Sequence, residues 1–267
     1  MKTLYESILD DDLDKISIVK IQENIFSEWV KKNYSPNYNV MFEYNEKSNA
    51  IDIPGFINIG RSMTLLPKSI RFGNVAGLSI SNFRYLKNNN LPIHADFIDT
   101  YECDDILPQS IEYNCTQALI HSNCNCVINI EEPIYWEKKT PGIIGISCMR
   151  NERVNRIKIN SSGHDIYVVW DSPWTQSSVI EQLAAKQPKT SKEALDIVLG
   201  IIDIKEIEKQ WKDIKVIYFN KGWLSDGFNR FSNRMIYGGM DRVKKDMREG
   251  ECYIIKENGK WKAVYKK

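Results

Sequence analysis

A pattern of five residues that occurs twice constrains the fold of this chain more than any other feature. Residues 66–70 read Leu-Pro-Lys-Ser-Ile and residues 107–111 read Leu-Pro-Gln-Ser-Ile, an offset of 41 positions. The agreement at this offset continues through the pairs Phe72/Tyr113, Leu78/Leu119, Ser81/Ser122 and Asn82/Asn123. A match of this length predicts that residues 65–130 contain repeated structural units.

A third Leu-Pro pair, at residues 91–92, supplies one more unit between these two. Taking Leu78, Phe97 and Leu119 as equivalent positions gives steps of 19 and 22 residues, which are typical of leucine-rich repeats. Each unit of such a repeat buries its apolar side only when a neighbour stacks on it. We therefore expect stacked coils with parallel strands and with these three residues in one core. An ordinary meander of strands is the alternative.

Four sequence segments resemble uncharacterised leucine-rich-repeat-like proteins of phages that infect gut Bacteroides and of Bacteroidetes genomes. These segments are MKTLYESILDDDLD at the start, WVKKNY at 29–34, RFGNVAGLSISN at 71–82 and LPQSIEYNCTQALIHSNCNC at 107–126. The resemblance covers about the first half of the chain. It implies a binding scaffold of phage type, either a virion component or a host-directed binder. It brings no catalytic residues with it.

Apolar spacing predicts a helix before the repeats and strands on both sides of them. Residues 18–33 place Ile18, Ile21 and Trp29 at helical steps, so we expect an amphipathic helix with Trp29 in the core. Residues 38–53 predict a β-hairpin that Pro54-Gly55 ends.

The second half of the chain predicts a mixture of helices and hairpins. Residues 156–160 and 166–170 alternate about a turn, which indicates a hairpin. Thr190 and Glu193 form a capping box at a helix start. Residues 252–265 flank Asn258-Gly259, the strongest short signal for a tight hairpin turn.

Together these features predict an α+β fold in three parts. Residues 1–60 hold the N-terminal helices and a capping hairpin, and residues 61–132 form the degenerate leucine-rich-like coil stack. Residues 133–267 form a smaller, basic α+β domain that ends in a hairpin. The segment 133–141 begins and ends with proline and reads as the linker between the last two parts.

Charge is distributed unevenly between the halves. Residues 1–131 carry 11 Lys and Arg against 17 Asp and Glu, and residues 132–267 carry 25 against 18. The asymmetry favours either attraction between the halves or a basic C-terminal surface for an acidic partner. No secretory signal or membrane-spanning run is present, so we expect a cytoplasmic location, in the host cell or the virion if phage-encoded.

The cysteines and histidines favour free thiols over metal or catalytic sites. Four of the six cysteines lie in the repeats near His121, namely Cys103, Cys115, Cys124 and Cys126. Cys124 and Cys126 have a C-x-C spacing, which differs from the Cys-x-x-Cys pairs of structural zinc sites. The common nucleotide-binding, hydrolase and zinc-protease motifs are absent. We therefore expect no catalytic residue, no metal site and no cofactor.

The densest polar and aromatic cluster runs from residue 221 to residue 242. Trp223, Arg230, Arg234 and Arg242 are the candidate nucleic-acid contacts there, because aromatic rings stack on bases and arginines bind phosphates. The competing interpretation places Phe228 and Phe231 in a core and leaves the arginines solvated. The sequence thus favours a non-enzymatic scaffold that binds a protein partner. A nucleic-acid-binding or nucleic-acid-processing C-terminal domain is the alternative.

Overall fold

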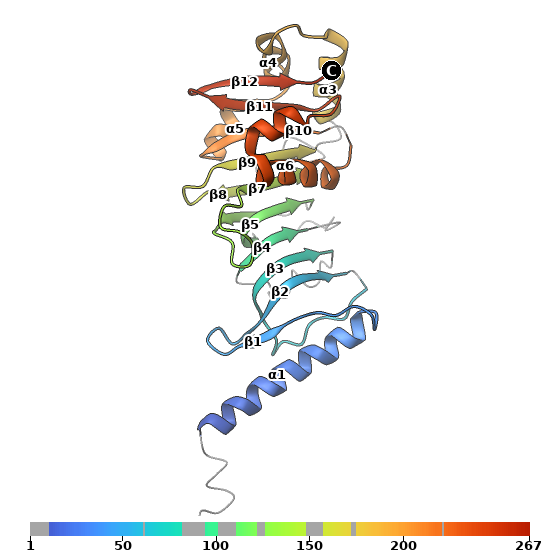
Figure 1. Cartoon of the computed structure of the whole chain (residues 1–267), viewed down its shortest axis with the longest axis vertical. Helices are drawn as coiled ribbons and strands as arrows, with labels where there is room; N and C mark the ends of the chain where they lie inside the picture. Colours follow the sequence, from blue (N-terminus) through green and yellow to red (C-terminus); the bar gives the residue numbers. More distant parts are fainter. Residues whose placement is uncertain are drawn as a thin grey trace, which may run out of the picture. The chain divides into compact units, whose positions relative to one another are not determined.

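The computed structural model describes residues 11–60, 62–81, 94–100, 111–121, 126–147, 157–171, 175–220 and 222–267. The chain is α+β, as the sequence predicts (Figure 1). Its helices are α1 (Asp11–Asn33), α3 (Thr175–Lys186), α4 (Ser191–Leu199), α5 (Ile204–Gln210) and α6 (Leu224–Lys245). Its strands are β1 (Glu43–Asn45), β2 (Ala50–Ile59), β3 (Phe72–Ile80), β4 (His94–Asp99), β5 (Ile111–Ile120), β6 (Cys126–Ile130), β7 (Gly142–Ser147), β8 (Ile157–Asn160), β9 (Ile166–Asp171), β10 (Ile214–Phe219), β11 (Cys252–Glu257) and β12 (Lys260–Tyr265).

The chain divides into two compact units, Met1–Ala95 (unit 1) and Asp96–Lys267 (unit 2). The division falls inside β4. This division lies within the expected repeat region, and the predicted boundaries after residues 60 and 132 stay predictions. Each unit contains both parallel and antiparallel strand pairs.

Unit 1 is built on β2, which pairs with β1 antiparallel and with β3 parallel. The predicted hairpin is therefore confirmed at β1 and β2, but the predicted break at Pro54-Gly55 is wrong. Strand β2 continues through both residues to Ile59, with register shifts on either side of Ile53. Proline is tolerated there because β1 pairs only with residues 50–52, so no neighbour needs the missing N–H at position 54.

Helix α1 confirms the helix predicted at 18–33 and starts earlier, at Asp11. Trp29 is buried as expected, and its indole Nε1 donates to the Thr64 carbonyl at 2.9 Å. Phe26 packs edge-on against Phe42 with ring centroids 4.7 Å apart. Ile18 and Ile21, expected in the same apolar face, are instead about half exposed. Both lie in the first half of the helix, whereas Phe26, Trp29 and Asn33, which contact the rest of unit 1, lie in its second half.

In unit 2, strands β5, β7, β9 and β10 pair in parallel, and β11 and β12 add antiparallel to β10. Strand β6 pairs with the first half of β5, and β8 pairs with β6. The predicted hairpin of residues 156–170 is wrong, because β8 and β9 join different parallel neighbours, β6 and β7. The turn between β8 and β9 is held by a residue distant in sequence, since the Ser161 hydroxyl donates to the Asp213 carboxylate at 2.7 Å.

Helices cover both faces of the β9–β11 region (Figure 1). Alternate residues of a strand point to opposite faces, and Val169, Tyr218 and Tyr253 pack under α6. Their neighbours in the strands point the other way, where Trp170 lies 6.2 Å from the ring of Trp211, just after α5. The sheet therefore has a core on each face, and α6 covers one of them.

The local signals in the second half are confirmed. The Thr190 hydroxyl accepts from the Glu193 N–H at 3.1 Å at the start of α4. Strands β11 and β12 form the terminal hairpin, and Asn258 and Gly259 both have positive φ. Those angles match the two-residue turn that Asn-Gly favours.

Among the residues proposed as repeat equivalents, Leu78 and Leu119 are buried and Phe97 is partly buried. Leu78 is fully buried in unit 1, while Phe97 and Leu119 contribute to one core in unit 2. Strands β2 and β3 are parallel, as are β5, β7 and β9. The leucine-rich-like coil stack itself stays a prediction. Asn82, Asn123, Cys103 and Cys124 lie outside the described residues.

The segment expected to be a linker is instead attached to β4 by a buried carboxylate. Asp96 is fully buried and accepts the backbone N–H groups of Ile134, Tyr135 and Trp136 at 2.7–2.8 Å. The ring of Trp136 stacks on Phe97 at 6.2 Å. Residues 133–141 therefore connect β6 and β7 within unit 2.

Candidate functional site

Helix α6 packs the apolar residues of the polar and aromatic cluster against the sheet. Phe228, Phe231 and Met235 recur at three- and four-residue steps and are buried, which confirms the prediction for both phenylalanines. Phe228 fits over β7 because position 145 is glycine. A Cβ there would lie 2.7 Å from the Phe228 ring and 2.5 Å from the Leu119 side chain.

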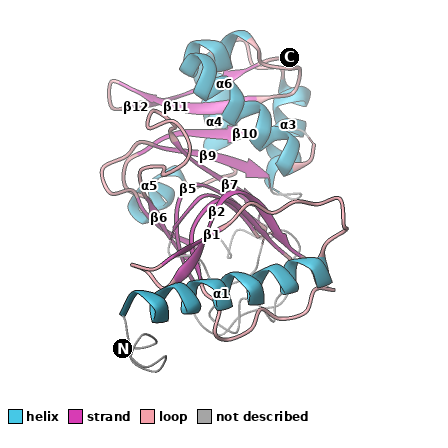
Figure 2. Ribbon diagram, turned by 60° about the horizontal axis from the view of Figure 1, so that its bottom comes forward, coloured by secondary structure: helices cyan, strands magenta, loops and turns pink. Residues whose placement is uncertain are grey.

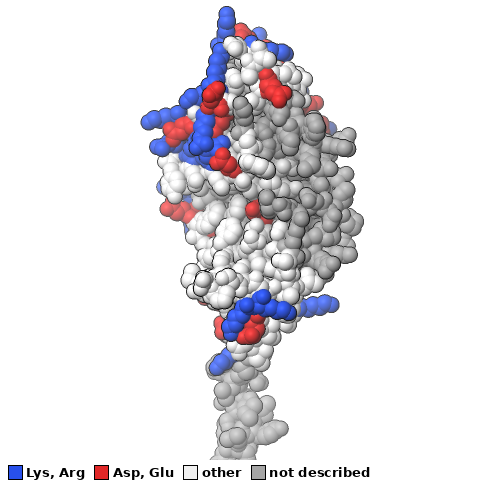
Figure 3. Space-filling model, turned by 90° about the vertical axis from the view of Figure 1, so that its right-hand side faces the viewer, with Lys and Arg blue, Asp and Glu red and all other residues white. Residues whose placement is uncertain are grey.

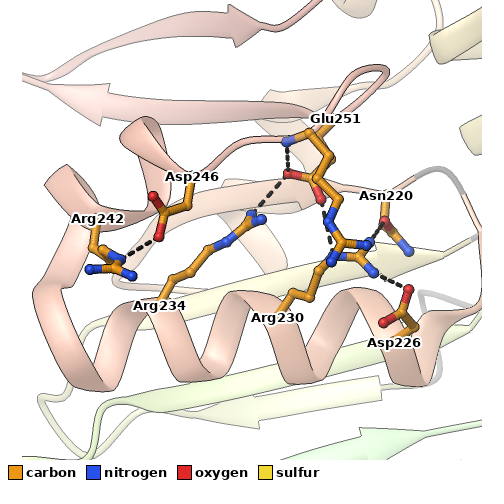
Figure 4. A network of polar contacts seen from close by, with 8 residues as sticks. Asn220, Asp226, Arg230, Arg234, Arg242, Asp246 and Glu251 are labelled. Atoms are coloured by element: carbon orange, nitrogen blue, oxygen red, sulfur yellow. Dashed lines mark hydrogen bonds and ion pairs between the residues drawn. The ribbon is translucent and has the colours of Figure 1, made fainter.

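A buried carboxylate, Glu251, lies beside the polar edge of α6, in the turn that leads into β11. Its side chain is 2% exposed and accepts from Arg230 Nε at 3.2 Å and Arg234 Nη1 at 2.9 Å. The backbone N–H of Arg248 donates to the same carboxylate at 2.8 Å (Figure 4). Three donors thus satisfy one charge that has little contact with water.

Arg230 extends this network toward the start of α6. Its Nη2 donates to the Asn220 side-chain oxygen at 2.7 Å, and its Nη1 pairs with Asp226 (Figure 4). Asn220 in turn lies against Gly227, where a Cβ would be 2.3 Å from the Asn220 amide nitrogen. Glycine at this position lets the loop after β10 approach the helix closely.

The network fixes the charge of its members. Burial by itself raises the pKa of Glu251, but the hydrogen bonds from Arg248 and Arg234 outweigh it and hold that pKa below its usual range. Glu251 is therefore ionised at neutral pH, and it neutralises arginines whose side chains are only 13% and 10% exposed.

The four candidate nucleic-acid contacts fall into three different settings. Arg230 and Arg234 come together around Glu251, which contradicts the expectation of solvated arginines. Arg242 is more than half exposed and pairs with Asp246 one turn later. Trp223 is 83% exposed just before α6. The structure therefore brings only two of the four together, and each of the three arginines has a carboxylate partner.

Glu251, Asn220 and Asp226 are network members that sequence reasoning missed. Asp226 has a local signal, because it stands four residues before Arg230 on a helix. Asn220 stands just before α6, and its side-chain amide donates to the Trp223 carbonyl at 3.1 Å. Glu251 meets the arginines of α6 through the β10–β11 pairing, which no sequence pattern in this chain specifies.

A second candidate surface lies in unit 1, along the part of β2 that β1 leaves unpaired. The Tyr38 hydroxyl donates to the Phe56 carbonyl at 3.0 Å, and the Tyr34 hydroxyl donates to the Asn58 carbonyl. The two tyrosine rings stack at 4.8 Å, and burial raises the pKa of the Tyr34 hydroxyl. These side chains occupy acceptors that an edge strand would otherwise present to another chain.

Phe56 completes this surface. It is 50% exposed, and its ring covers Gly77 of β3, where a Cβ would lie 2.2 Å from the ring. Tyr38 beside it is 42% exposed. We call Tyr34, Tyr38 and Phe56 the aromatic edge. Apolar surface held in place in this way is typical of a contact surface for another molecule.

The chemistry-bearing side chains do not assemble into a reaction centre within the described ranges. His164 approaches Glu132 at 3.7 Å, and Asp165 approaches Lys215 at 3.6 Å, both near the surface. Burial lowers the pKa of His121. No group of three or more His, Cys, Asp or Glu side chains in the described part of the chain could hold a metal ion.

The described cysteines are buried and form no disulfide bond. They are Cys115, Cys126 and Cys252. Burial raises the pKa of the Cys252 thiol to about 12 and also raises that of Cys115. A buried thiol that stays protonated reacts slowly with oxidants and metals.

Comparison of the chain with protein-family models, with curated proteins and with solved structures finds no match. Among the helices described, none has the length and apolar character needed to cross a membrane.

Proposed function

We propose that this protein is a non-enzymatic interaction scaffold that binds a protein partner through the aromatic edge of unit 1. The observation that carries the proposal is Phe56, a half-exposed aromatic ring held over Gly77 beside the exposed Tyr38. Large aromatic side chains held in a fixed position lose little entropy on binding, and they are common anchors of protein interfaces. The parallel strands β2 and β3 would form the outer coils of the leucine-rich-like stack.

The resemblance of the first half to phage and Bacteroidetes proteins supports a phage-type role. That role would be as a virion component or as a binder directed at the host, in the cytoplasm of the infected cell or in the virion. No cofactor enters this proposal.

The alternative is a C-terminal domain that binds nucleic acid. It is supported by Trp223 and Tyr237, which are both 83% exposed at either end of the first part of α6. It is weakened by the arginines, because guanidinium groups already paired with Glu251, Asp226 and Asp246 have less to gain from phosphate. On the face shown in Figure 3, carboxylates are interspersed among the lysines and arginines of unit 2.

A comparison of two double variants separates these functions. Tyr38→Ser with Phe56→Ser changes the aromatic edge, and Trp223→Ser with Tyr237→Ser removes the more exposed rings of α6 as a matched control. We expect a partner isolated with the wild-type protein from infected or host cells to be lost by the first variant and retained by the second.

Titration of the intact protein with single-stranded DNA and RNA tests the alternative. Phosphate binding weakens steeply as salt rises, so tight, salt-sensitive binding that disappears in the Trp223 and Tyr237 variant would contradict the proposal. Circular dichroism of both variants checks that the fold is kept.

A further inference from the structure

The tip of the β11–β12 hairpin holds the only Asn-Gly pair in the sequence, Asn258-Gly259. Both residues are exposed, and the strand pairing closes at Glu257 and Lys260, so the two residues lie outside the ladder of β11 and β12. Their φ angles, 51° and 72°, are those of a two-residue turn with both residues in the left-handed region. In Figure 2 this turn is the loop at the left-hand end of β11 and β12.

The backbone nitrogen of Gly259 is accessible to the side chain that precedes it. Neither the Gly259 N–H nor the Asn258 side chain makes a hydrogen bond within the described part of the chain. Apart from the adjacent residues, no heavy atom lies within 4 Å of the place that a Cβ of residue 259 would take. Glycine also has no side chain that would shield its own nitrogen. The amide of Asn258 and the nitrogen of Gly259 can therefore meet without displacing another group.

We propose that Asn258 is a site of spontaneous deamidation, with water as the only other reactant. The Gly259 nitrogen loses its proton and attacks Cγ of Asn258. A bond between this nitrogen and Cγ forms as the Cγ–Nδ2 bond breaks, and the amide nitrogen takes up a proton and leaves as ammonia. Water then opens the cyclic imide. Addition at Cγ gives aspartate, and addition at the main-chain carbonyl carbon of Asn258 gives isoaspartate.

The pair Asn160-Ser161 provides an internal control in the same chain. The Asn160 side-chain oxygen accepts the Ser162 N–H at 3.4 Å, and Asn160 pairs with Asn129 at the end of β8. Ser161 is buried, and its hydroxyl donates to Asp213 at 2.7 Å. Ring closure at Asn160 would break these contacts, whereas ring closure at Asn258 breaks none.

The turn itself sets the rate of the reaction. The cyclic imide holds the main chain of Asn258 at a ψ angle that this turn type does not use, so the tip must open before the ring can close. Local opening at an exposed tip costs much less free energy than global unfolding. We therefore expect deamidation of the folded protein, at a lower rate than in the unfolded chain. The rate should rise with pH, because the attacking group is the deprotonated amide.

The product changes both the charge and the main chain of the tip. Glu257, next to Asn258, contacts Lys244 at 3.3 Å and pairs with Lys262. Either product adds a second carboxylate beside Glu257. Isoaspartate also lengthens the main chain, so a two-residue turn no longer closes the pair of Glu257 with Lys260.

Peptide mapping by mass spectrometry tests the site. The intact purified protein is incubated at mildly alkaline pH, with and without urea. In the folded protein we expect conversion of Asn258 while Asn160 stays intact, and in urea we expect faster conversion of both. An Asn258 that stays intact in the folded protein while it converts in urea would overturn the proposal. Conversion of Asn160 as fast as that of Asn258 in the folded protein would do the same.

The variant Asn258→Asp separates the effect of charge from that of the main chain. It carries the new carboxylate on a normal main chain, and Asp-Gly favours the same turn, so its melting temperature should stay close to that of the wild type. The isoaspartyl form, isolated by chromatography, should melt at a lower temperature than this variant. Equal melting temperatures would contradict the loss of the turn. These measurements use purified protein without a partner, so their outcome is independent of the aromatic-edge variants.

Discussion

Glu251 connects α6 to the sheet, because it is buried between two arginines of the helix and the backbone before β11. A buried ion pair adds little stability over an apolar pair of the same shape, but losing one member leaves a buried charge unpaired. Arg230 and Arg234 are therefore part of the internal structure of unit 2.

Arg234→Ala should lower the free energy of unfolding by about 2–3 kcal/mol, measured by urea denaturation. A hydrogen bond to a charged group contributes about this much to stability. The decrease is smaller than for a buried carboxylate left with no partner, because Arg230 still contacts Glu251.

Arg242→Ala is the matched control for this change. Its pair with Asp246 is exposed and lies within one helix, so we expect a change within about 0.5 kcal/mol. Equal effects of the two substitutions would show that burial of the Glu251 network is not what distinguishes them.

Acid should weaken the protein partly through Glu251. The pKa of this carboxyl in the folded chain lies below its ordinary value of 4.5, so its contribution is complete above the unfolded pKa and is lost as pH falls through the folded pKa. The difference in unfolding free energy between the wild type and Glu251→Gln should be largest at neutral pH and should shrink below about pH 4.5. A difference that stays constant down to about pH 3 would show that ionised Glu251 is not responsible.

At the scale of elements, α6 contacts β7 closely because residue 145 of β7 is a glycine. Gly145→Ala would place a Cβ 2.5 Å from the Leu119 side chain and 2.7 Å from Phe228. Overpacking of this kind costs about 1–3 kcal/mol. Gly55→Ala, where no heavy atom lies within 4 Å of the added Cβ, should change stability by less than about 1 kcal/mol. Thermal melts of both variants compare them directly, and a Gly55→Ala change as large as that of Gly145→Ala would contradict the packing argument.

Elements specified by neighbouring residues were predictable, and elements specified by distant strands were not. The Asn258-Gly259 turn, the Thr190 cap and the buried Phe228 and Phe231 follow from local conformation and helical spacing. The hairpin expected at residues 156–170 was wrong because alternation of apolar residues does not specify which neighbour a strand joins. Here β8 and β9 each find a parallel partner earlier in the chain.

The candidate site was predictable only in part for the same reason. The sequence identified Arg230 and Arg234, but their partner Glu251 approaches them through the β10–β11 pairing. The aromatic edge was missed because Pro54-Gly55 indicated the end of a strand, whereas β2 continues through both residues to Ile59.

At the scale of the whole molecule, the charge difference between the halves does not leave the arginines of α6 unpaired. Arginines there are paired with carboxylates, while unit 1 exposes apolar groups on α1 and β2. The distribution favours contacts with proteins over contacts with phosphate. Within this account, the aromatic edge binds the protein partner.

Hydrogen exchange of the protein with and without its isolated partner tests the central claim most directly, because it maps the contact along the backbone. We predict slower exchange on binding at residues 34–38 and 54–59, which form the aromatic edge, and unchanged exchange at residues 222–237 of unit 2. Protection confined to residues 222–237, with none at the aromatic edge, would contradict the account.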